Sequence, residues 1–206
     1  MATEPGEHDG LELAQRMLRT FRVGTLLFDD NLRPMRFVID PESGRLAMPM
    51  MVAMIQTDHQ VLMIPEETED SLQLLLSVET IDEHHALADR WRIYHGEPQD
   101  IHWTLSWIDA AKLRGLVLDG DALMGRNPLD IEETRVVSAM NQRIDDLRTL
   151  CRVYGGMEVE SPLCVGADSW GLHVKARFDI VRVETTREAR GGDDLLVMLD
   201  DMARSS

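Results

Sequence analysis

Residues 23–40 read VGTLLFDDNLRPMRFVID, and they carry the pattern that decides the fold. The apolar run VGTLLFD (23–29) leads into a cluster of turn-forming residues, DDNLRP (29–34), and a second apolar run, MRFVID (35–40), follows. Short apolar runs bounded by Asp, Asn and Pro are typical of strands joined by a turn. We therefore predict two strands with a turn between them.

The same pattern recurs along the first two thirds of the chain, after an amphipathic helix at 11–21. Further strands are predicted in QVLMIPE (60–66), SLQLLLSVETI (71–81), RWRIYHG (90–96), IHWTLSWI (101–108) and LRGLVLDGDAL (113–123). The methionine-rich run RLAMPMMVAMI (45–55) is interpreted as core filling, with Pro49 at a sheet edge or a bulge. About seven short strands with regular turns favour a barrel or a sandwich over a parallel sheet.

The pattern changes after the linker candidate GRNPLD (125–130). A single helix is predicted over 131–156, ending at two glycines. Strands follow in SPLCVGADSWG (161–171), LHVKARF (172–178) and IVRVETT (180–186), and a helix capped by Asp193 closes the chain. We predict a barrel domain at 1–128 and a small α-β-β-α domain at 129–206.

Charge and composition exclude several functions. Hydrophobic residues make up 44% of the chain, which suits a globular core, and the net charge of −16 repels phosphate backbones and anionic lipids. The first ten residues lack the pattern of a signal peptide, and the longest apolar run, Met48–Ile55, is too short to span a bilayer. We expect a cytoplasmic protein that binds neither nucleic acid nor membrane.

No catalytic motif stands out in the sequence. No glycine-rich phosphate loop follows a strand, and no nucleophile–base set is recognisable from spacing. In DEHHALAD (82–89) a helix would bring Asp82, His85 and Asp89 to one face, but a solvated loop is the favoured interpretation, and no metal site is predicted. Cys151 and Cys164 are expected to be two buried thiols rather than a disulfide.

Several segments resemble the pyridoxamine 5′-phosphate oxidase-like, FMN-binding split-barrel superfamily. In the barrel these are RVGTLLFDDNLRP (22–34), DRWRIYHGEP (89–98) and LRGLVLDGDAL (113–123). The segments MNQRIDDL (140–147), CVGADSWGLHV (164–174) and RFDIVRVET (177–185) are similar to the small domain of haem-iron-utilisation proteins. The resemblance spans 11–205 and implies an α+β fold, a split β-barrel followed by the small domain. Such loose hydrophobic frames indicate fold better than activity.

The resemblance also implies a homodimer that holds FMN or haem between two barrels, and, if the protein is an enzyme, an FMN-dependent oxidoreductase or a haem-utilisation protein. Relatives bind the FMN phosphate in the stretch that matches GRLAMPMMVAMIQTDHQ (44–60). Here that stretch offers Arg45 and then no cation or hydroxyl until Thr57. The alternative is therefore a cofactor-free member of the fold that binds a small molecule, a peptide or another protein.

Two groups of cations are the candidate cofactor-binding residues. Arg90, Arg92 and His95 follow one another along the predicted strand 90–96, where they would contact an anion at the mouth of the barrel. The plainer interpretation is that these are surface cations paired with nearby acids.

The second group lies on the predicted strand 172–178. Alternation places His173, Lys175 and Arg177 on one face, where they could hold a carboxylated or phosphorylated planar ligand, with His173 as an axial haem ligand. The alternative is a solvated face, or one that meets an acidic surface of the barrel or of a dimer partner.

Overall fold

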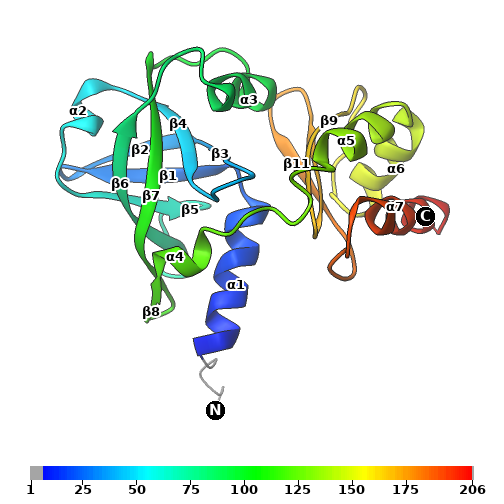
Figure 1. Cartoon of the computed structure of the whole chain (residues 1–206), viewed down its shortest axis with the longest axis horizontal. Coiled ribbons are helices and arrows are strands. Elements are labelled where there is room, and N and C mark those ends of the chain that lie inside the picture. Colours follow the sequence, from blue (N-terminus) through cyan, green and yellow to red (C-terminus); the bar gives the residue numbers. More distant parts are fainter. Residues whose placement is uncertain (1–6, 206) are drawn as a thin grey trace. The chain divides into compact units, whose positions relative to one another are not determined.

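A computed structural model describes residues 7–205, and the chain divides into two compact units, Met1–Gly125 and Arg126–Ser206 (Figure 1). The first unit holds an eight-stranded sheet and the second a three-stranded sheet, and every strand pair is antiparallel. Helices accompany both sheets. The predicted α+β fold, a curled half-barrel followed by a smaller domain, is confirmed.

The elements of the first unit alternate strands with short helices. In chain order they are α1 (Glu7–Thr20), β1 (Val23–Phe28), β2 (Asn31–Arg36), β3 (Val38–Ile39), β4 (Leu46–Met50), α2 (Val52–Ile55), β5 (Gln60–Ile64), β6 (Leu72–Thr80), α3 (Ala86–His95), β7 (His102–Leu113), β8 (Leu116–Asp119) and α4 (Gly120–Leu123). The strand order is β2-β1-β5-β6-β7-β4-β3, and β8 pairs with β7. Strands β2 and β3 are therefore the ends of the main path through the curled sheet.

The first hairpin is tighter than the sequence suggests. Phe28 pairs with Asn31, so only Asp29 and Asp30 form the turn, with φ of 42° and 61°. Two positive φ values are typical of a type I′ turn, whose twist matches that of the strands. Residues 31–34, predicted as part of the turn, already belong to β2. Pro34 is tolerated there because β2 has only one neighbour, so its missing N–H need not cost a ladder bond.

The predicted strand at 90–96 is wrong, because these residues belong to helix α3. Leu87, Trp91 and Tyr94 are buried at helical spacing, with exposed fractions of 6%, 5% and 2%. Ile93, which would share a strand face with Trp91, is 53% exposed. Over so short a segment, the apolar pattern is compatible with a strand and with a helix. Only the burial seen in the structure distinguishes the two.

The core of the first unit fills the concave side of the sheet. Met48, Met50 and Met54 are fully buried in it, as predicted for methionines that fill a core, whereas Met51 of the same run is 36% exposed. Pro49 pairs with Trp103 of β7, while β3 pairs with β4 only at residues 46 and 47, so Pro49 lies where β4 has one neighbour. Among residues 7–205, no helix combines the length and the hydropathy needed to cross a bilayer.

The second unit contains α5 (Glu133–Asn141), α6 (Ile144–Val153), β9 (Leu163–Asp168), β10 (Gly171–Lys175), β11 (Ile180–Glu184) and α7 (Gly192–Arg204). Its strand order is β11-β10-β9, and the helices share one apolar core with the sheet. The arrangement is α-α-β-β-β-α rather than the predicted α-β-β-α: the strands lie in the three segments predicted as strands, and two helices stand where one was predicted. Cys151 and Cys164 are both free and buried in this core, as expected.

Two local predictions in this unit are corrected. The single helix expected over 131–156 is broken at Arg143, whose φ of −124° and ψ of 59° are not helical. Asp145 and Asp146 then occupy the first turn of α6, where carboxylates favour a helix start. At α7 the capping residue is Gly191, and Asp193 lies inside the first turn rather than at the cap.

Candidate functional site

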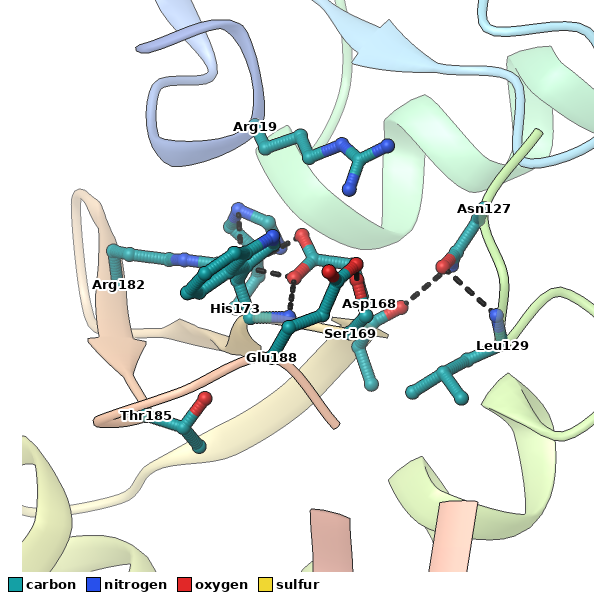
Figure 2. A network of polar contacts seen from close by, with 12 residues as sticks. Arg19, Asn127, Leu129, Asp168, Ser169, His173, Arg182, Thr185 and Glu188 are labelled. Carbon is teal, nitrogen blue, oxygen red and sulfur yellow. Dashed lines mark hydrogen bonds and ion pairs between the residues drawn. The ribbon is translucent and has the colours of Figure 1, made fainter. Parts of the chain in front are cut away.

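His173 lies in a buried polar network of the second unit rather than on a solvated face (Figure 2). It is 1% exposed and pairs across the sheet with Arg182 of β11. Both ring nitrogens lie 3.5 Å from Nη1 of Arg182. Arg182 in turn forms a two-pronged ion pair with Asp168, with N···O distances of 2.7 and 2.9 Å. The side chains of Arg182 and Asp168 are only 7% and 9% exposed.

The turn between β9 and β10 holds this network in place. The Trp170 N–H donates to Oδ1 of Asp168 at 2.8 Å, and the Ser169 hydroxyl donates to Glu188 at 2.8 Å (Figure 2). Gly171 has a φ of 138°, and a Cβ there would lie 2.0 Å from the Val183 carbonyl oxygen. Only glycine fits this position, because β10 and β11 approach too closely for a side chain.

By alternation Lys175 shares a face of β10 with His173, whereas Arg177 lies beyond the end of the strand. Strand β10 ends at Lys175, and the Ala176 N–H donates to the Asp179 carbonyl at 2.8 Å, which closes a turn. Arg177 lies in this turn, with its guanidinium 5.0 Å from the ring centroid of Phe178. Together with Met157–Val159 and Leu163, the turn encloses a pocket of about 760 Å³, which we call the C-terminal pocket.

The other predicted cations lie on α3 and contact groups of their own unit. Arg92 donates to Asp89 at 2.8 Å and lies 5.0 Å from the ring of Trp103. Arg90 lies over the ring of Tyr94 at 5.4 Å. Nε2 of His95 lies 3.1 Å from the carbonyl oxygen of Phe37. None of these three cations lines either pocket described here. Cofactor binding by them stays a prediction.

The suggested metal set does not form. His85 is the N-cap of α3 and accepts a hydrogen bond from the Leu87 N–H, while Asp82 precedes the helix. Asp82, His85 and Asp89 therefore do not share a helix face. Within residues 7–205, no group of three or more His, Cys, Asp or Glu side chains could hold a metal ion.

A second pocket, of about 580 Å³, lies in the first unit where β2 comes near the end of β4; we call it the seam pocket. Its walls are β1 and β2, Pro49, Trp91 of α3 and the segment 97–100. The indole N–H of Trp91 donates to the Arg36 carbonyl at 2.9 Å, and Arg33 pairs with Asp100 at 2.8 Å. These two contacts fix α3 and the segment after it against β2.

Sequence reasoning missed this pocket because its residues are far apart in the chain. Pro34, Pro49, Pro65 and Pro98 all line it, yet each by itself looks like an ordinary turn or edge proline. The strand predicted at 90–96 also hid Trp91, which reaches β2 only because α3 is a helix. Two resemblance segments, 22–34 and 89–98, cover parts of its walls, and these were the available signals.

The residues that line the seam pocket do not fit FMN or haem. A phosphate dianion needs several donors or cations, and four prolines of the seam pocket offer no N–H. Three carboxylates, Glu66, Glu97 and Asp100, face the same space. No His, Cys, Lys or Tyr lies among its lining residues, so an axial haem ligand other than Met35 is missing. His173, the predicted axial ligand, is buried against Arg182 and lines neither pocket.

The fold matches solved structures of very different sequence. The protein Atu2129 of Agrobacterium tumefaciens, of unknown function, is 14% identical over 98% of this chain and 100% of its own, with a TM-score of 0.68. A heme binding protein from Mycobacterium smegmatis is 17% identical over 99% and 98% of the two chains, with a TM-score of 0.46. A candidate pyridoxamine 5′-phosphate oxidase from Listeria innocua is 15% identical over 52% and 98%, with a TM-score of 0.39. No family model matches the chain, and neither does any curated protein.

These likenesses concern the fold alone. The match to the Atu2129 structure covers both units of this chain. The other two TM-scores lie below 0.5, so what those proteins bind carries no argument for this chain. Any ligand has to be inferred from the residues themselves.

Proposed function

We propose that this protein is a dimeric, cofactor-independent binding protein of the split-barrel fold, and that its seam pocket takes a small organic cation with an apolar body. The observation that carries the proposal is the lining of the seam pocket. Four prolines and Trp91 supply apolar walls, while Glu66, Glu97 and Asp100 supply negative charge. Apolar walls with a few placed polar groups are typical of small-molecule sites.

The arginines of the seam pocket do not make the net charge of its lining positive. Arg33 is paired with Asp100, so its charge is largely offset, and Arg36 is the second cation. Three carboxylates against two guanidinium groups leave the lining negative, within a chain whose net charge is −16. An anion would be repelled by this field, and a cation would be attracted to it.

The dimer is proposed from the outer surface of the sheet. The side chains of Leu32, Leu27, Val61, Leu75 and Ala110 form one row across five strands, because each pairs with the next in register. This outer row carries no charge, and Leu32 and Leu75 are 48% and 38% exposed. A second copy that packs on the outer row would cover it without bringing like charges together.

Ligand titration tests the binding proposal. The purified protein is titrated with benzylamine, benzoate, FMN and hemin, and tryptophan fluorescence and calorimetry are followed. We expect saturable binding of benzylamine, weaker or undetectable binding of benzoate, and no saturable shift of the FMN or hemin spectrum. Stoichiometric flavin or haem in gently purified protein would overturn the proposal in favour of a redox cofactor.

Matched variants locate the site. Glu97→Gln removes a carboxylate of the pocket and should weaken benzylamine binding about three- to tenfold. Arg36→Gln removes a cation from the same pocket and should leave the affinity unchanged or raise it. Equal affinities of both variants and the unchanged protein would mean that benzylamine binds elsewhere.

A further inference from the structure

The C-terminal pocket is built from two walls that the fold holds firmly. One wall is the turn after β10, closed by the bond from the Ala176 N–H to the Asp179 carbonyl. The other wall is the segment that follows α6. There the Met157 N–H donates to the Cys151 carbonyl at 3.0 Å, and Nε of Arg148 donates to the Glu160 carbonyl at 2.9 Å. Both walls are therefore set before any ligand arrives.

The two walls carry different charges. Lys175, the last residue of β10, and Arg177 of the turn lie on one wall, and Glu158 and Glu160 belong to the segment after α6. Asp179 adds a third carboxylate at the far end of the turn. Three acids against two cations make the pocket a poor site for a simple anion, while the two cations give one wall positive charge.

Apolar surface connects the charged walls. Phe178 is 73% exposed, Leu163 is 46% exposed and Met157 is 38% exposed, and all three line the pocket. Arg177 already lies over the Phe178 ring, which favours a further flat or apolar group beside it. A volume of about 760 Å³ suits a small organic ligand or a short peptide.

We propose that the C-terminal pocket binds a zwitterion with an apolar body. The ligand carries a free carboxylate, which Lys175 and Arg177 hold. It also carries a free ammonium, which Glu158 and Glu160 hold. Its apolar side-chain atoms pack on Phe178. A free apolar amino acid and a short apolar peptide both have this chemistry. The site is separate in sequence from the seam pocket and does not depend on the ligand proposed there.

The test uses four probes with the full-length protein: L-phenylalanine, the dipeptide Leu-Phe, N-acetyl-phenylalanine and phenylalanine amide. The acetyl group removes the ammonium charge and the amide removes the carboxylate, so each blocks one wall. We expect saturable calorimetric binding of phenylalanine or Leu-Phe below about 10 mM, and weaker binding of both blocked compounds. Tighter binding of Leu-Phe would identify a peptide as the source, and tighter binding of phenylalanine a free amino acid.

Variants assign the walls. The double variant Lys175→Gln, Arg177→Gln should bind phenylalanine or Leu-Phe about tenfold more weakly. It should no longer bind them more tightly than phenylalanine amide. The double variant Glu158→Gln, Glu160→Gln should no longer bind phenylalanine or Leu-Phe more tightly than N-acetyl-phenylalanine. Arg152→Gln, which removes an exposed cation of the same unit outside the pocket, should change nothing.

The outcomes decide the proposal. These positions lie at the surface, so circular dichroism should be unchanged in every variant, and a binding loss then reports on the pocket. No saturable binding of either free probe would overturn the proposal, and so would unchanged discrimination in both double variants. Benzylamine binding at the seam pocket is measured with separate variants, so one proposal can fail while the other stands.

Discussion

The side-chain amide of Asn141 bonds to both backbone groups of Cys164 on the outer strand of the small sheet. Its Nδ2 donates to the Cys164 carbonyl at 2.9 Å, and its Oδ1 accepts from the Cys164 N–H at 2.8 Å. Three residues further along β9, Glu133 accepts from the Ala167 N–H at 3.0 Å, and Asn127 donates to the Ala167 carbonyl at 2.8 Å. Side chains thus occupy the place of a fourth strand and block edge-to-edge pairing.

Replacing Asn141 should uncover this edge. Asn141→Leu removes both bonds and leaves the Cys164 backbone groups unpaired, so we expect the free energy of unfolding to fall by about 2–3 kcal/mol. Asn141→Asp keeps the acceptor for the Cys164 N–H, so its free energy of unfolding should fall by less. Urea denaturation followed by circular dichroism gives both values. Equal stability of the two variants would mean that the acceptor bond contributes nothing.

The ion pair between Arg182 and Asp168 gives a second prediction, because both side chains are more than nine-tenths buried. Asp168→Asn keeps an acceptor for the Trp170 N–H but leaves the guanidinium without its counter-charge. We expect a loss of about 3–5 kcal/mol in the free energy of unfolding. Asp168→Leu combined with Arg182→Met removes both charges and should recover most of that loss. A double variant as unstable as the single one would contradict this account.

The buried thiols should be unreactive in the folded protein. Burial raises the pKa of Cys151 to about 11 and that of Cys164 to about 12, so neither is a thiolate near neutral pH. We expect a thiol reagent at pH 8 to label neither residue until denaturant is added, as absorbance would measure. Rapid labelling of the native chain would contradict the burial.

The same shifts predict a dependence of stability on alkaline pH. A folded-state pKa raised above the ordinary value of 9.0 means that the folded chain holds the thiol proton more tightly than the unfolded chain. This contribution is complete below pH 9 and is lost as the pH rises toward 11 and 12. Urea midpoints measured from pH 8 to pH 11 should therefore fall, and a flat profile would contradict the raised pKa values.

Elements with a strong local pattern could be predicted from the sequence. The strands at 60–66 and 101–108 alternate or run apolar between turn residues, and β5 and β7 occupy them. The helix at 192–204 has a full amphipathic stripe and is present as α7. In each case one local period decides the structure, and tertiary packing agrees with it.

The predictions that were wrong failed because tertiary packing, rather than local pattern, determines the structure there. Arg92 and Ile93 fit a strand by alternation, and α3 forms because Trp91 and Tyr94 are buried together on one helix face. The sequence predicted His173 on a cationic strand face, because it does not show that β11 and β9 flank β10 and place the Arg182–Asp168 pair beside His173. Local pattern carries no information on such pairings, which depend on the register of the sheet.

The outer row gives the last prediction. Leu75 lies in this row between Val61 and Ala110, and it is 38% exposed, so a glutamate there costs a monomer little. In a dimer closed over the outer row, Leu75→Glu would bring two carboxylates into an apolar interface, and we expect at least about a 100-fold weaker association. The control is Val117→Glu on β8, which is 73% exposed and outside the row. Light scattering at micromolar concentration should give a dimer mass for the unchanged protein and the control and a monomer mass for Leu75→Glu. A monomeric unchanged protein would overturn the proposed dimer, because an apolar row that needed covering would then stay exposed.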